Sequence, residues 1–114
     1  MSSIATSPLQ LFCYLKGDHY KRAFRVTIGM EESVDDLKEV IKERMKPSFD
    51  HIPANSLVLW NVKIPLDKHL KEAVDKLGLV GEESLSPSIK LLNVIPHQPA
   101  DGHIHIVVNP VGKY

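Results

Sequence analysis

The sequence lacks features on which several classes of protein depend. It contains a single cysteine, Cys13, so no disulfide can form within the chain and no disulfide framework indicates an oxidising destination. Acidic and basic side chains number 14 each, so no general basic field argues for nucleic-acid binding. No apolar run approaches the ~20 residues of a transmembrane helix. We therefore expect no direct nucleic-acid binding and no transmembrane segment.

The remaining composition is that of an ordinary globular domain. Hydrophobic residues make up 43% of the chain and charged residues 25%. A chain of 114 residues can build one core without disulfides. Residues 1–8 are small and polar, lack the basic start of a signal peptide, and are expected to be disordered. We predict one domain over residues 9–109, followed by the start of a linker or tail at 110–114.

One amphipathic helix is predicted over residues 33–46, and the rest of the domain is expected to pack around it. Its apolar residues recur at spacings of three and four, which places them on one face. Ser33 is suited to cap the start, with Asp36 as a shorter version of the capping-box glutamate. Pro47 ends the helix. The apolar stripe comprises Val34, Leu37, Val40, Ile41 and Met45.

Four segments are predicted as strands, at residues 9–15, 23–28, 57–64 and 103–108. The first, second and fourth alternate with a period of two. The first two are predicted to form an antiparallel hairpin across the turn at Gly17. A second helical stripe runs from Leu66 to Leu77, with Gly78 placed to cap it. Residues 89–95 fit either a helical turn or a strand. The predicted inward residues are Leu9, Leu11, Cys13, Leu15, Phe24, Val26, Ile28, Ile104, Ile106 and Val108.

This order of elements predicts an α+β fold of the β-grasp type. A hairpin is followed by a helix across it, and a late strand fills the middle of a mixed sheet. The layout resembles that of ubiquitin, with an insertion over roughly residues 66–100 that carries the second helix.

Several motifs together resemble the ubiquitin-like N-terminal domain of Crinkler effectors, proteins of oomycetes and some fungi. The run from Leu11-Phe12-Cys13 to Lys16-Gly17-Asp18 is similar to the family's LFLAK motif, with Cys13 and Tyr14 as departures. Residues 104–110 are similar to its terminal HVLVxxP motif. Further similarity lies in the helix at 33–42 and in residues 59–65, 70–72, 82–85 and 102–108.

The resemblance implies a secreted module of virulence or symbiosis that takes part in delivery to host cells. In the family this N-terminal domain precedes variable effector domains, which frequently act in the host nucleus. The resemblance therefore implies protein–protein interaction or self-association rather than catalysis, and no cofactor. The alternative is an intracellular ubiquitin-like adaptor domain that binds a protein partner.

The predicted partner-binding face is the side of the sheet turned away from the 33–46 helix. This face carries several aromatic side chains, which are preferred anchors in interfaces. We expect a protein partner, a second copy of the chain or both to bind there. Alternatively, the second helix folds back through Leu70 and Val74 and covers the same face. The six residues are Phe12, Tyr14, Val58, Trp60, His105 and Val107.

No catalytic or metal site is predicted. Cys13 lies in the inward alternation of a strand, where a buried and unreactive thiol is expected, and the pattern places no base beside it. His103 and His105 share a strand face, but no third ligand set lies near them in the sequence, so we interpret them as surface histidines. We therefore expect a domain that is not an enzyme.

Overall fold

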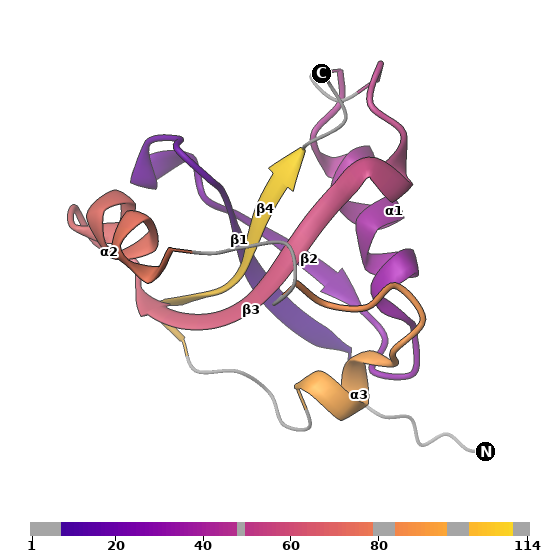
Figure 1. Ribbon diagram of the computed structural model, residues 1–114. Coiled ribbons are helices and arrows are strands. Elements are labelled where there is room, and N and C mark those ends of the chain that lie inside the picture. Colours follow the sequence, from indigo (N-terminus) through magenta and orange to yellow (C-terminus); the bar gives the residue numbers. More distant parts are fainter. Residues whose placement is uncertain (1–7, 48–49, 79–83, 96–100, 111–114) are drawn as a thin grey trace.

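The structure is a computed structural model that describes residues 8–47, 50–78, 84–95 and 101–110. The disorder predicted for residues 1–8 and the tail after 110 lie almost wholly outside this range. Figure 1 shows a sheet with helices on both of its sides. The strands are β1 (Leu9–Leu15), β2 (Phe24–Ile28), β3 (Leu57–Pro65) and β4 (His103–Pro110), and the helices are α1 (Val34–Arg44), α2 (Leu70–Leu77) and α3 (Leu91–Val94), with short 3-10 turns at Tyr20–Arg22 and Ala54–Ser56.

The sheet is mixed, with the strand order β2-β1-β4-β3. β1 and β2 form the predicted antiparallel hairpin. β4 lies in the middle, parallel to β1 and antiparallel to β3. β4 reaches Pro110, which pairs with Leu57, so the strand runs two residues beyond its predicted end. The predicted α+β architecture is confirmed.

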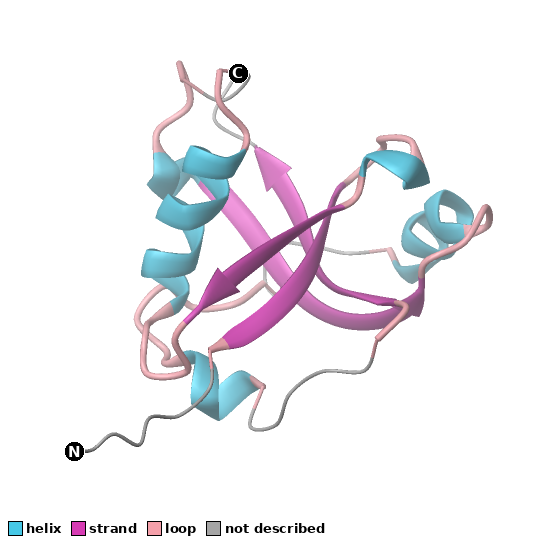
Figure 2. Ribbon diagram, turned by 180° about the vertical axis from the view of Figure 1, so that it is seen from behind, coloured by secondary structure: helices cyan, strands magenta, loops and turns pink. Residues whose placement is uncertain are grey.

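α1 packs across one face of the sheet, as predicted from its apolar stripe. Val34, Leu37 and Ile41 are fully buried against the inward residues of β1 and β2. The segment before α3 holds the start of α1, because the amide of Val34 donates to the carbonyl of Ile89 at 2.9 Å. Residues 89–95, which fitted either a helical turn or a strand, contain one turn of helix, α3. Figure 2 shows α1 and α3 from the other side of the molecule.

The two faces of β4 are not divided as the alternation predicts. Ile106 and Val108 join the core beneath α1, but Ile104 packs in a second cluster on the opposite face. The register between β3 and β4 shifts between Asn61 and Ile64. Three residues of β3 span the interval covered by two of β4, so the extra residue lies in β3, where it bends and twists that strand. Ile104 pairs with Ile64 beyond this bulge, and both join the second cluster.

We expect Ser33→Ala to lower the free energy of unfolding by about 1 kcal/mol. Ser33 Oγ accepts the amide hydrogen of Asp36 at 3.2 Å, and the Asp36 carboxylate accepts the backbone amide of Ser33 at 3.0 Å. These bonds to Ser33 hold the pKa of Asp36 below its usual value. A carboxylate whose pKa falls on folding stabilises the protein above its unfolded pKa, and this contribution is lost as pH falls through the folded pKa.

The measurement is urea unfolding at about pH 7 and at a series of lower pH values, since the stability from Asp36 is lost as pH falls through its lowered folded pKa. The difference between wild type and Ser33→Ala should narrow as the pH falls. Ser88→Ala, at an exposed turn position, is the matched control. An equal loss of stability in both variants would contradict the capping role.

Candidate functional site

The structure divides the six residues of the predicted partner face. Phe12 and Val58 are half-buried. The other four are buried, with exposed fractions from 0% to 6%. The expectation of an exposed face is therefore wrong for these four, and the alternative left open by the sequence, a cover formed by the second helix, is the arrangement found. The buried residues are Tyr14, Trp60, His105 and Val107.

α2 forms this cover. Leu70 and Val74, one helical turn apart, are fully buried, and Gly78 ends the helix in the left-handed conformation with φ 59°. The predicted stripe is partly wrong at its end, because Leu77 is 50% exposed. The second cluster beneath α2 contains Tyr14, Trp60, Ile64, Leu70, Val74, Ile104 and Val107.

The polar end of Tyr14 is satisfied within this second cluster. Its hydroxyl donates to the backbone carbonyl of Asp18. Burial raises the pKa of Tyr14, and the charges of Asp18 and of Asp75 on α2 raise it further. The phenol therefore stays a protonated donor at neutral pH, which keeps a buried polar group paired.

The interpretation of both β4 histidines as surface residues is wrong for His105. Its side chain is 6% exposed, and Nδ1 accepts the backbone amide of Phe12 at 3.0 Å. The ring thereby bonds a β1 amide just beyond the described β1–β4 pairing, which begins at Cys13 and Ile106. Within the described residues no group of three or more potential ligands is placed to hold a metal ion.

Cys13 is buried, as predicted, and burial raises the pKa of its thiol far above the usual range. We expect the folded chain at about pH 8 to react slowly with a thiol reagent such as dithionitrobenzoate. The reacting species is the thiolate, which the raised pKa of Cys13 disfavours, and burial keeps the reagent away from the sulfur. The measurement compares the reaction in buffer with that in guanidinium chloride, where the thiol should react fully. Rapid reaction in buffer would contradict the burial.

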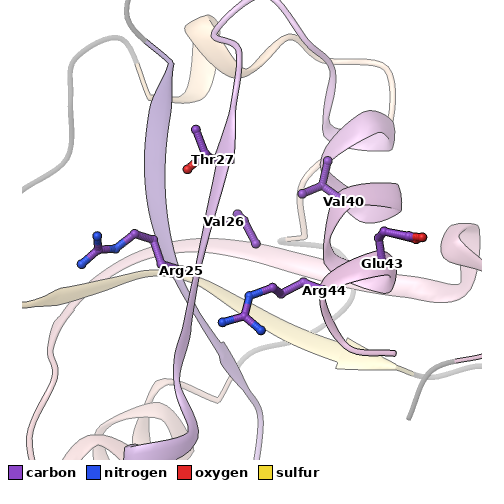
Figure 3. Close-up of a pocket in the computed structure, with 6 residues that line it drawn as sticks. All are labelled: Arg25, Val26, Thr27, Val40, Glu43 and Arg44. Atoms are coloured by element: carbon purple, nitrogen blue, oxygen red, sulfur yellow. The ribbon is translucent and has the colours of Figure 1, made fainter. Parts of the chain in front are cut away.

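An open groove of about 330 Å³ lies between β2 and α1. Figure 3 shows Val26 and Val40 extending toward each other across it, while Arg44 reaches from α1 toward β2. Arg25 projects from β2 on the side away from α1. This β2–α1 groove, lined by Arg25, Val26, Thr27, Val40, Glu43 and Arg44, is the candidate interaction site.

Two cation–π contacts position the arginines of the groove. The guanidinium carbon of Arg25 lies 5.1 Å from the ring centre of Phe12, and that of Arg44 lies 5.9 Å from the ring centre of Phe24. Such contacts stabilise a cation without neutralising it. Both guanidinium groups therefore keep a full charge to offer to an anion.

Sequence reasoning did not identify this groove. In the sequence, Arg25 lies between the inward residues Phe24 and Val26, and Arg44 lies near the end of the predicted 33–46 helix. The missing information was that β2 is the end strand and that α1 runs beside it. Half-buried Phe12, from the predicted partner face, supports Arg25.

The sheet order and the helix across it are those of ubiquitin-like domains. The structure resembles the solution structure of a ubiquitin-like domain from an Arabidopsis thaliana protein, with a TM-score of 0.53 at 17% identity, covering 94% of this chain and 81% of that one. Residues 9–109 match the family described as the Crinkler effector protein N-terminal domain, and the chain belongs to that family.

The chain also matches a longer Crinkler effector protein over part of that protein's length. The chain is 29% identical over 102 residues to Crinkler effector protein 1 of Rhizophagus irregularis. The match covers 90% of this chain and 21% of that protein, so the chain spans about a fifth of its relative's length. None of the helices in the described ranges is long and apolar enough to cross a membrane.

Proposed function

We propose that this chain is the non-catalytic N-terminal module of a secreted Crinkler-type effector, acting in delivery to host cells and in contact with a protein partner. The observation that carries the proposal is the family match over residues 9–109, which spans all four strands up to the penultimate residue of β4. The match coincides with one folded unit. A module of this kind precedes other domains in the effector, and the host nucleus is a proposed destination.

The chemistry of the described residues supports a role without catalysis. The thiol of Cys13 is buried and held protonated, which removes the strongest nucleophile of the chain. The imidazole of His105 is occupied by a structural hydrogen bond to the β1 backbone. The groove beside β2 instead offers fixed charges and apolar side chains, which are features of binding surfaces.

Delivery is tested with a reporter that works only in host cytosol. The chain is fused to a calmodulin-dependent adenylate cyclase and expressed in a transformable oomycete or fungus that colonises plant tissue. We expect cyclic AMP in the host tissue to exceed that produced with the reporter alone. A matched control carries ubiquitin in place of this chain, since it shares the fold but not the family.

The alternative function is an intracellular ubiquitin-like adaptor. The shared fold favours it, because fold alone does not determine location. In the same experiment an adaptor leaves the reporter inside the producing cell. No cyclic AMP in the host, with the fusion intact in the producing cell, would overturn the delivery role and favour the adaptor.

A further inference from the structure

The two end strands of the sheet differ in how their outer edges are covered. At β3, the carbonyl of Leu59 accepts the amide of Leu85 at 2.7 Å, so a neighbouring segment occupies part of that edge. β2 is the other end strand, and no strand of the described residues pairs with its outer side. Open strand edges pair readily with another extended chain.

The direction of the backbone groups on β2 follows from the bonds of β1. The amides of Phe12 and Lys16 donate toward β4, to His105 and to Val108. Neighbouring residues of a strand turn their backbone groups to opposite sides, so those of Leu11 point toward β2.

Leu11 stands opposite Val26, and Phe12 stands opposite Arg25. Because Val26 pairs inward with Leu11, its neighbours Arg25 and Thr27 turn their N–H and C=O groups outward. Two residues on the open edge thus present two donors and two acceptors to an incoming strand.

These backbone groups lie along the β2–α1 groove. A strand added beside β2 would set alternate side chains toward α1, over Val26 and Val40, and the remaining side chains toward the opposite face, beside Arg25. Arg44 stands at the α1 side of the same path. The added strand would therefore place apolar side chains on Val26 and Val40 at its α1 face, and it would have an arginine beside each of its two faces.

The charge of the groove is positive. Its acidic member, Glu43, is paired with Lys46 at 3.0 Å. No carboxylate among the described residues lies within ion-pair distance of Arg25 or Arg44. Arginine binds carboxylates in a bidentate manner that lysine cannot match. An acidic occupant would complement these charges.

We propose that the β2–α1 groove binds an extended acidic segment of a partner protein as a fifth strand of the sheet. Main-chain bonds to Arg25 and Thr27 supply the pairing, which is the usual basis of strand addition. Acidic side chains opposite Arg25 and Arg44 supply the specificity. This inference rests on the proposed function only in that this domain contacts a protein partner.

A second copy of the chain is a poorer occupant. Pairing β2 with β2 of another copy would bring two Arg25 and two Arg44 side chains along one short interface. The Glu43 carboxylate of each copy is already held by its own Lys46. Like charges at close range across strands are destabilising.

The test uses three fluorescent ten-residue peptides and the chain itself. The first alternates valine and glutamate, the second alternates valine and lysine, and the third is the valine–glutamate peptide with alternate amides N-methylated. We expect the first to bind and the other two to bind at least about tenfold more weakly, because they lack the acidic side chains or the backbone donors. Amide chemical shifts of Arg25 and Thr27 should move on binding.

Charge-reversal variants locate the binding. Arg25→Glu and Arg44→Glu are each expected to weaken binding of the valine–glutamate peptide by at least about tenfold. Lys63→Glu, an exposed position on β3, makes the same change of charge at the other end of the sheet and should leave binding unchanged. Thermal unfolding of each variant verifies that it is folded.

Each other result would overturn the proposal. The first such result is no binding of the valine–glutamate peptide. The second is that the valine–lysine peptide binds as tightly as the valine–glutamate peptide. The third is that Lys63→Glu weakens binding as much as the two arginine variants do. A wild-type dimer with protected β2 amides would make a second copy the occupant instead. The delivery assay is independent of these peptides, so failure of the groove leaves the proposed function standing, and failure of delivery leaves the groove standing.

Discussion

Trp60→Asp is expected to unfold the domain. The indole is 4% exposed and packs in the second cluster beneath α2. Removing a buried tryptophan side chain costs about 3–5 kcal/mol. Burying an unpaired carboxylate adds a further cost. Together these exceed the lower part of the 5–15 kcal/mol by which domains of about this size are typically stable.

The measurement is circular dichroism with light scattering, which together report folding and oligomeric state. Leu77→Asp is the control, because Leu77 lies on α2 but is 50% exposed, and it should remain folded. A folded Trp60→Asp monomer would show that the indole lies on an accessible surface. A wild-type dimer that becomes a folded monomer in the variant would restore the partner face predicted from sequence.

Leu37→Ala and Leu70→Ala are each expected to lower the free energy of unfolding by about 2–5 kcal/mol. Leu37 lies in the core beneath α1 and Leu70 in the cluster beneath α2, and both are fully buried. β4 contributes side chains to both cores. We therefore expect one cooperative transition, lowered by either substitution.

The check is urea unfolding monitored by Trp60 fluorescence and by far-ultraviolet circular dichroism. The two curves should coincide in both variants, and the two losses should be close to additive because the leucines lie in separate clusters. Lys71→Ala, at an exposed position next to Leu70, provides the control and should change stability little. A fluorescence transition that precedes the circular dichroism transition in Leu70→Ala would mean that the α2 side unfolds independently.

Local patterns predicted much of this fold. The alternation correctly placed the residues of β2 and of β1 as far as Cys13 that face α1, because these faces pack on the α1 core with a period of two. Ser33 and Asp36 located the start of α1, since a capping box depends only on neighbouring residues. Both signals depend only on residues within one strand or helix, so they can be recognised without knowing the tertiary structure.

The burial of the second face was not predictable in the same way. The stripe of α2 shows that the helix must cover something, but its partner is chosen by the path of the chain after β3. The segment from Ile104 to Val108 is buried on both sides, as befits a central strand. The prediction for His105 was wrong because its polarity suggested solvent, whereas its ring bonds the Phe12 amide.

The candidate site depends on the same missing information. Arg25 and Arg44 stand 19 positions apart in the sequence, and only the sheet order places both beside an open edge. Exposed arginines on a strand and on a helix end are common, so neither residue is distinctive by itself. The groove is a property of tertiary arrangement.

The central position of the last strand has a consequence for synthesis. The Phe12–His105 bond joins residues 93 positions apart, and β4 separates β1 from β3. A sheet closed by such distant partners has a high contact order and folds slowly. While β4 is still inside the ribosome, the nascent chain can form the β1–β2 hairpin and α1. It cannot complete the sheet, because β4 is the strand that joins β1 to β3. We therefore expect the domain to fold only after residue 110 emerges, which gives any export machinery acting during translation an unfolded chain.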